Sequence, residues 1–442
     1  MDPEAVLDLA RRRADEAEVY VSDSEETPVA FEANRLKLLQ TRHIRGMGLR
    51  VIKDGRLGFA ASTRPGERDA LVDMALEVAA FGAEARFHLP PPAAYPAVEA
   101  FDPATAAVPL AEMVALGQGL IDGVLAAAPE LVCDAGVRRT VQRVRILNSA
   151  GTDVSYQRTV FRVGVTGERV RDTDMLWVGD EEVSTRPIRD VSRILQHTLT
   201  QLERARENVP MRSGELPVIF TPDGVASALL APLLVAFSGK IVLQGASPLG
   251  ESLGAQVYDE RLTIVDDPLL PWRPSSRPCD DEGVPSRRNL LVERGVVRTF
   301  LYDLQTAGMA GRESTASAQR GFASQPSIGA TAVVIEPGEH RFEDLVAGID
   351  EGLVVEHVIG AAQGNVLGGE FGGNVVLGYK VERGRIVGRV KNTVIAGNVH
   401  QLFKRLGALG NDARWVGAGL YTPSILFERV SVATSGEGAA RG

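Results

Sequence analysis

The sequence predicts an α+β protein: an amino-terminal α/β domain with an antiparallel sheet and helices, followed by a carboxyl-terminal β-rich domain with short helices. The chain has 442 residues, and a single core stops growing at about 250–300 residues. Helical periodicity alternates with long strand-like runs in the first half, whereas the second half carries short strands and hairpin turns. We therefore expect two domains, residues 1–209 and 215–442.

The first elements follow from local patterns. Apolar spacing predicts a helix over residues 4–17, and the alternation in residues 18–21 predicts a short strand. Asp54-Gly55 lies between two β-rich runs, and this dipeptide favours a hairpin because both turn positions need positive φ. An apolar stripe then predicts a helix over residues 67–81.

The middle of the chain sets the expected domain boundary. Residues 87–109 hold six of the 24 prolines and predict an extended loop. A helix over 110–127, a β-rich stretch over 131–178 and a polar helix over 186–208 should follow. Pro210 and the Ser213-Gly214 turn then break the pattern, so we place the boundary at residues 209–215.

The second half opens with a predicted strand at 217–220. Thr221 is a good N-cap residue and Pro222 suits the first helical position, so an apolar helix is expected over 225–237. Hairpins are predicted around Arg294-Gly295 and Arg383-Gly384, and further strands at 332–335 and 425–432.

Composition excludes several functions. The formal charge of −9 and the pI of about 5.4 argue against nucleic-acid binding, which requires a basic face. The longest uncharged stretch, residues 224–239, is shorter than the ~20 apolar residues that span a bilayer. Cys133 and Cys279 form no disulfide framework, and the acidic amino terminus does not resemble a secretory signal. We expect a soluble cytoplasmic protein without membrane or nucleic-acid partners.

No catalytic or metal-binding residue can be assigned from the motifs. The six histidines include no pair at the i, i+4 spacing by which a helix presents two imidazoles to zinc, and HExxH and HExxxH are both absent. Cys279 has no nearby histidine and is interpreted as structural. The expectation is therefore no catalytic residue and no metal in this chain.

One acidic cluster has more than one interpretation. Asp280, Asp281 and Glu282 precede a glycine and could bind a cation, act as acid and base, or bind a peptide's amino terminus. The alternative is a solvated turn, which the spacing favours, because cation loops spread their oxygens over alternate positions.

A glycine-rich segment is the second candidate peptide-binding site. Gly368, Gly369, Gly372 and Gly373 flank Glu370 and Phe371, and they leave a strand surface without side chains. An extended peptide could exchange main-chain hydrogen bonds with such a surface. Alternatively, the glycines only allow a sharp sheet bend.

Several motifs in fixed order give the chain a family resemblance. They are Asp266-Asp267-Pro268, Asp280 to Arg288, Asn365 to Gly373, Gly397-Asn398, Gly410-Asn411-Asp412 and Pro423-Ser424-Ile425, with weaker support from Phe31 to Leu36 and Gly46 to Arg50. In these motifs the chain resembles the TldD/TldE family, also called PmbA or modulator of DNA gyrase proteins, over most of its length.

The resemblance implies a role without zinc. Members work in pairs, and the TldD-like subunit carries an HExxxH helix, a Cys ligand near the carboxyl terminus and the metallopeptidase activity. Here the corresponding helix reads from Ala231 to Ser238 without His or Glu, and no Cys follows Asp412. The chain resembles TldE, so zinc is expected only in the TldD-like partner, and this chain should be inactive alone.

Three functional hypotheses remain at this point. The first is a non-catalytic, TldE-like subunit of a TldD/TldE metalloprotease complex that acts on unfolded or extended peptides. The second is an independent hydrolase that uses Asp280, Asp281 and Glu282 or an unassigned site. The third is a stand-alone homodimeric peptide-binding protein. The expected partners are accordingly a TldD-like zinc subunit or a second copy, and a peptide.

Overall fold

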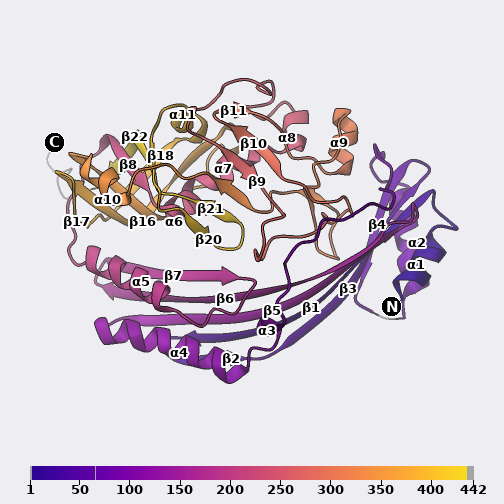
Figure 1. The fold of residues 1–442 in the computed structure, drawn as a ribbon, viewed down its shortest axis with the longest axis horizontal. Coiled ribbons are helices and arrows are strands. Elements are labelled where there is room, and N and C mark those ends of the chain that lie inside the picture. Colours follow the sequence, from indigo (N-terminus) through magenta and orange to yellow (C-terminus); the bar gives the residue numbers. More distant parts are fainter. Residues whose placement is uncertain (1, 65, 436–442) are drawn as a thin grey trace.

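A long curved sheet lies beneath a compact, β-rich carboxyl-terminal half (Figure 1). The computed structural model describes residues 2–64 and 66–435. The curved sheet comes from the first half of the chain, and its strands run under the second half (Figure 1). The two parts therefore meet along a broad face.

The amino-terminal sheet is entirely antiparallel and has the strand order β4-β3-β1-β5-β6-β7, with β2 paired to β1. Its strands are β1 (Glu16–Glu32), β2 (Arg35–Leu39), β3 (Arg42–Lys53), β4 (Arg56–Ser62), β5 (Val132–Asn148), β6 (Asp153–Arg171) and β7 (Asp174–Ser184). In β5 and β6 successive side chains alternate between the two faces, as the period of two requires.

Helices cover this sheet in two places. α1 (Pro3–Ala10) and α2 (Arg68–Ala79) share a core with β1 and β3, while α4 (Leu110–Ala127) and α5 (Ser192–Arg204) pack near β5 to β7, and α3 (Pro103–Ala106) is a single turn. α4 is long and apolar enough to cross a membrane by composition, but it packs on β1, β5 and β6 through Met113, Leu120 and Ile121. The core helix of a globular protein has the same composition.

The carboxyl-terminal half contains a closed ring of five strands. β15 (Glu351–Ile359) pairs with β8 (Gly214–Phe220), then β22 (Ile425–Thr434), β18 (Thr393–Asn398) and β16 (Glu370–Glu382), and β16 returns to β15. β17 (Arg385–Arg389) extends β16, and β19 (Leu406–Leu409) extends β22. Closure leaves few sheet edges exposed.

A second sheet of this half has the order β11-β10-β9-β14-β21-β20. Its strands are β9 (Ile264–Asp266), β10 (Asn289–Glu293), β11 (Val296–Val297), β14 (Val333–Ile335), β20 (Arg414–Val416) and β21 (Leu420–Thr422), and β12 (Ala318–Gln319) pairs with β13 (Ser327–Ile328) alone. The short helices are α6 (Pro222–Gly224), the π-helix η1 (Val225–Leu229), α7 (Leu230–Val235), α8 (Gly239–Leu243), α9 (Leu304–Ala310), α10 (Phe342–Ala347), the 3₁₀ turn η2 (Val366–Gly368) and α11 (Val399–Lys404).

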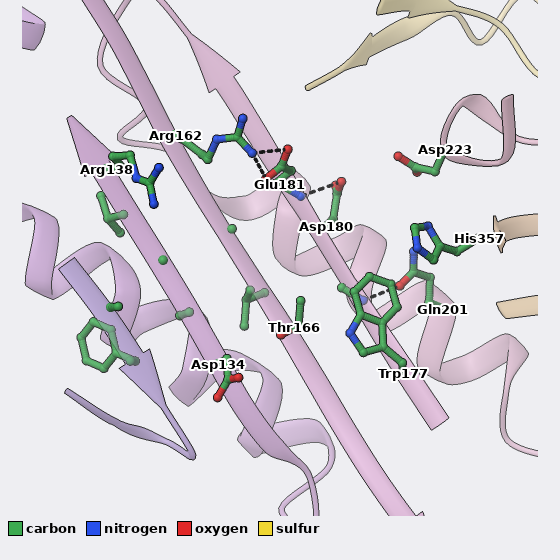
Figure 2. Close-up of a pocket in the computed structure, with 18 of the residues that line it drawn as sticks. Asp134, Arg138, Arg162, Thr166, Trp177, Asp180, Glu181, Gln201, Asp223 and His357 are labelled. Atoms are coloured by element: carbon green, nitrogen blue, oxygen red, sulfur yellow. Dashed lines mark hydrogen bonds and ion pairs between the residues drawn. The ribbon is translucent and has the colours of Figure 1, made fainter. Parts of the chain in front are cut away.

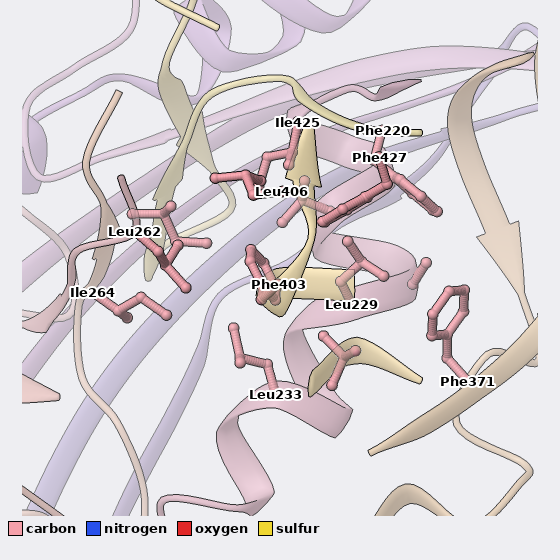
Figure 3. Packing of buried hydrophobic residues seen from close by; sticks show 14 of the residues in the cluster. Phe220, Leu229, Leu233, Leu262, Ile264, Phe371, Phe403, Leu406, Ile425 and Phe427 are labelled. Atoms are coloured by element: carbon pink, nitrogen blue, oxygen red, sulfur yellow. The ribbon is translucent and has the colours of Figure 1, made fainter. Parts of the chain in front are cut away.

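Aromatic and aliphatic side chains pack together in the carboxyl-terminal core (Figure 3). Phe220 meets Phe371 and Phe427 edge-on, with ring centroids 6.1 and 5.9 Å apart. A second core crosses between the halves: it joins Val163 and Ile194 of the first half to Leu377 and Tyr379 of the second. The interface between the halves is therefore a packed core.

The α+β fold predicted from the sequence is confirmed, and the deviations have physical reasons. The predicted helix at 4–17 ends at Ala10, and the predicted strand at 18–21 is the 17-residue β1, because β1 pairs with both β3 and β5. The hairpin at Asp54-Gly55 and the Thr221 N-cap are as predicted. The apolar helix predicted over 225–237 begins as a π-helix.

Replacing Phe220 with Ala should destabilise the protein strongly. Its ring is fully buried between two other aromatic rings, and a Phe→Ala cavity of this kind costs about 3–5 kcal/mol. Urea unfolding of the variant measures this loss. Phe81→Ala is the matched control, because that side chain is 93% exposed and its removal should change the unfolding free energy by less than about 0.5 kcal/mol. Equal effects would contradict the described core.

Candidate functional site

A pocket with a volume of about 650 Å³ lies between the amino-terminal sheet and the carboxyl-terminal half. Strands β1, β5, β6 and β7 form its floor, and α6, η1, β15 and β16 contribute from the other half. Three small residues of the floor, Ala30, Gly136 and Gly164, are register partners on the adjacent strands β1, β5 and β6. We call this pocket the groove; Figure 2 shows its side chains.

An aromatic pair and a charged cluster form one wall of the groove. Trp177 from β7 stacks on His357 from β15, with ring centroids 5.2 Å apart. Beside it, Asp180 of β7 and Asp223 of α6 approach each other from the two halves (Figure 2). Glu356 is buried next to His357 and accepts a hydrogen bond of 3.1 Å from the Thr221 hydroxyl.

Basic side chains neutralise these carboxylates. Arg414 of β20 forms an ion pair with Asp223 and lies 3.9 Å from Asp180, which also pairs with Arg193 at 2.9 Å. His197 stands between carboxylates: its Nδ1 is 3.3 Å from an Asp180 oxygen, and its Nε2 is 3.9 Å from Glu356. The cluster is thus a mixed network of acids and bases.

The pKa values in the cluster reflect burial against these neighbours. Burial alone would raise the pKa of Asp180, but His197 and Arg414 outweigh it and hold that pKa below its ordinary value. Burial would lower the pKa of His197, yet Asp180 and Glu356 hold it above the usual value. The pKa of Glu356 is raised, chiefly because its carboxyl is buried.

Three residues of this cluster have the spacing of possible metal ligands. Asp180, His197 and Asp223 each offer a ligand atom, and these atoms all lie within 4.8 Å of one another. However, Arg414 and Arg193 already supply positive charge to both carboxylates. A divalent cation would have to displace Arg414 from Asp223, so the set does not fit a zinc site. The absence of metal from this chain stays a prediction.

The three carboxylates singled out in the sequence are buried elsewhere. Asp280 accepts hydrogen bonds from the backbone N–H groups of Glu282, Val284 and Ala318 at 3.0 to 3.1 Å. Glu282 forms an ion pair with Arg50 of β3 at 2.5 Å and accepts a hydrogen bond of 2.7 Å from the backbone N–H of Leu304.

Asp281 completes this cluster. It pairs with Arg277 at 3.1 Å and accepts from the backbone N–H of Arg320 at 2.9 Å. All three acids are buried, with at most 7% of any of them exposed, so the alternative of a solvated turn is wrong. Because their oxygens are engaged inside the protein, the geometry favours a structural role. Peptide binding by Asp280, Asp281 and Glu282 stays an untested prediction.

The glycine segment lies apart from these acids, at the start of β16. In the described part of the chain, no hydrogen bond or ion pair joins residues 368–373 to residues 280–282. Gly369 has φ +86°, and a Cβ there would stand 2.3 Å from the His400 ring; a Cβ on Gly373 would stand 2.4 Å from the Ile359 carbonyl oxygen. Phe371 is buried and Glu370 is exposed.

These contacts give Gly369 and Gly373 a role in the fold. At Gly369 an L-residue would be strained by its φ and would also clash, and at Gly373 a side chain would push against a neighbouring backbone. The alternative that these glycines serve the bend is therefore favoured at both positions. A docked peptide at Gly368 or Gly372 stays an untested prediction.

The helix expected to carry a zinc motif in active relatives is apolar. The segment starts at Ala231, the second residue of α7. Leu233 and Ala236 are fully buried in the carboxyl-terminal core. The loop after Asp412, where the resemblance placed a thiolate, brings Arg414 onto Asp223. Neither element offers a soft metal ligand.

Sequence comparison decides the family. Models of PmbA/TldA metallopeptidase domains match three segments: domain 1 at residues 17–80, the central domain at 103–186 and the C-terminal domain at 213–434. The chain belongs to the PmbA/TldD family. The match to the third domain begins close to the boundary predicted at residues 209–215.

Relatives of the PmbA/TldD family align over nearly the whole chain. An uncharacterised protein of Methanocaldococcus jannaschii is 27% identical and covers 97% of this chain and 99% of its own length. A metalloprotease of Methanothermobacter thermautotrophicus is 25% identical, covering 91% of this chain and 89% of its own length. The crystal structure of TldE from Thermococcus kodakarensis superposes with a TM-score of 0.89 at 26% identity, covering 97% of this chain and 99% of that one.

Sequence reasoning missed the groove. Asp180, Asp223 and Glu356 come from positions far apart in the chain, and none of these three belongs to a motif on which the family resemblance rests. The one local signal was the N-cap pattern at Thr221-Pro222, which places Asp223 in the first turn of α6. A signal of that kind predicts a helix start and gives no indication of a pocket.

Gly369→Val should destabilise the fold rather than act only on a ligand. The strained φ and the contact with His400 predict a loss of about 1–3 kcal/mol in the free energy of unfolding. Gly372→Ala is the control, since its nearest neighbour would be 3.6 Å from the new Cβ. Chemical denaturation of both variants measures the difference. A Gly369 variant as stable as the Gly372 variant would contradict the assigned strain.

His400 should make stability fall at low pH. Burial lowers its pKa to about 4, whereas an unfolded histidine has a pKa near 6.5. The unfolded state therefore binds the extra proton first, and stability is lost as the pH falls from about 6.5 to 4, by up to roughly 3 kcal/mol. His400→Gln should flatten this part of the profile, and His340→Gln, at an exposed site, should not. Identical profiles for the two variants would reject this assignment.

Proposed function

We propose that this chain is a non-catalytic, TldE-like subunit of a metalloprotease complex that acts on unfolded or extended peptides. In this proposal a TldD-like zinc subunit supplies the catalytic metal, and this chain contributes peptide binding and completes the complex. The compartment in this proposal is the cytoplasm.

One observation carries the non-catalytic role. The loop that should supply a thiolate in zinc-binding members supplies Arg414 instead, and Arg414 is paired with Asp223 at the groove. A guanidinium cannot ligate zinc, and it competes with a cation for the same carboxylate. The apolar run from Ala231 to Ala236 likewise offers no general base for water activation. The family match and the likeness to a solved TldE support the same interpretation.

The shape of the groove supports peptide binding. Its floor is β-sheet with small residues at Ala30, Gly136 and Gly164, and a Cβ added at Gly136 would meet no atom within 4 Å. An extended backbone can approach such a floor closely. Trp177 and His357 provide stacked aromatic rings on which a side chain can pack.

An independent hydrolase has less support. The carboxylates of Asp280, Asp281 and Glu282 are buried and held by arginines and backbone N–H groups, so they cannot reach a scissile bond without unfolding their surroundings. No geometry in the described residues favours this hypothesis over the subunit role.

The chain should hold no stoichiometric zinc and should show no chelator-sensitive peptidase activity when purified alone. After mixing with the TldD-like zinc subunit of the same organism, a one-to-one complex that cleaves an unstructured peptide is expected. Elemental analysis, size-exclusion chromatography and a peptide-cleavage assay measure the three outcomes.

The same assays can reject the proposal. About one zinc per isolated chain together with cleavage would indicate an enzyme. A stable homodimer that elutes apart from the zinc subunit, and leaves its activity unchanged, would favour the stand-alone binding protein. A complex can also be reconstituted with the Arg414→Lys variant. Because lysine keeps the positive charge beside Asp223, the variant should still assemble with the zinc subunit.

A further inference from the structure

A second pocket, with a volume of about 530 Å³, is lined by three arginines. Arg158 comes from β6, Arg277 from the loop before the acidic cluster, and Arg320 from the segment after β12. Asp281 is the one carboxylate among its lining residues, and serine, threonine and glutamine side chains form much of the rest. We call this the arginine pocket.

The buried guanidiniums in the arginine pocket have donors to spare. Arg320 uses one nitrogen to bind Glu18 at 2.6 Å, but its Nε and Nη1 are buried without a hydrogen-bond partner. The Nε of Arg277 is also buried without a hydrogen-bond partner, although another nitrogen of that side chain forms an ion pair with Asp281. Both side chains are at least nine-tenths buried. Unsatisfied buried donors are costly and therefore favour an anionic acceptor from outside.

The arginine pocket and the groove lie on the same face of β6. Arg162 lines the groove and Arg158 lines the arginine pocket, and residues four apart on a strand share a face. The β20–β21 turn borders both pockets: Val416 lines the groove, and Ala418 and Gly419 line the arginine pocket. Arg158 and Arg162 are four residues apart on β6, a separation of about 13 Å, so an extended peptide needs about four residues to reach from one to the other.

We propose that the arginine pocket binds a carboxylate of an extended peptide that lies in the groove. This inference rests on the proposed peptide-binding function and specifies which end of the substrate is recognised. A planar carboxylate matches the fork of a guanidinium, and it would satisfy the remaining donors of Arg320 and Arg277, whose charges are paired with Glu18 and Asp281. Arg158, which hydrogen-bonds the neutral Gln142, would supply the positive charge. The peptide's carboxyl terminus would thus lie at the arginine pocket.

The test compares ten-residue peptides of Ala, Ser, Thr and Val, labelled with a fluorophore at the amino terminus. One peptide ends in a free carboxylate, the second in an amide, and the third in an amide preceded by Asp. Fluorescence anisotropy with the full chain measures their affinities. We expect the free acid to bind about tenfold more tightly than the amide, as for one charge-assisted hydrogen-bonded contact.

Arg158→Gln tests the pocket without removing the buried pairs that hold the fold. It should reduce the preference for the free acid at least threefold. Arg143→Gln is the matched control: Arg143 is exposed, and its register partner Gln157 places it on the opposite face of the sheet from Arg158. The control should keep the full preference.

The outcomes separate this inference from the proposed function. Equal affinity for the acid and the amide, or an unchanged preference in Arg158→Gln, overturns the arginine pocket as a carboxylate site and leaves peptide binding intact. No binding of any peptide rejects both. If the Asp-containing amide binds like the free acid, the site recognises a carboxylate of either source. If it binds like the plain amide, the terminal carboxylate is the ligand.

Discussion

A buried ion-pair network holds the two halves of this protein in register. Glu18 of β1 accepts from Arg50 of β3 at 3.2 Å and from Arg320 of the second half at 2.6 Å, and Arg50 also pairs with Glu282 at 2.5 Å. Removing one partner from such a network leaves an uncompensated buried charge and costs about 3–5 kcal/mol. Because the groove and the arginine pocket both lie where the halves meet, their geometry depends on these pairs.

Local signals in the sequence predicted the fold well where a backbone conformation required a particular residue. Asp54 and Gly55 have φ of 50° and 73°, as the predicted hairpin needs, and Thr221 caps its helix as expected. The length of β1 was not predictable in the same way, since its charged central part reads as polar loop. Pairing on both sides by β3 and β5 extends that strand, and such pairing is a tertiary effect.

The candidate site was harder to predict because its chemistry is assembled across the interface. A run of acids such as Asp280 to Glu282 draws attention in a sequence, yet the fold buries it as a link between the halves. Conversely, Asp180 and Asp223 are isolated acids in the sequence and become neighbours only when β7 meets α6. The family resemblance, carried by motifs in fixed order, gave the better functional guide, and the domain matches bear it out.

The charges around the groove fit a binding role better than a cleaving one. Metal-dependent peptide hydrolysis needs free His, carboxylate or thiolate side chains to hold the ion and a base to deprotonate water. In this chain Arg414 and Arg193 already form ion pairs with Asp223 and Asp180. Buried arginine nitrogens without a hydrogen-bond partner lie on Arg277 and Arg320 at the arginine pocket, and on Arg50 in the network between the halves. Under the proposed function, an anion such as a peptide terminus would satisfy the nitrogens of Arg277 and Arg320.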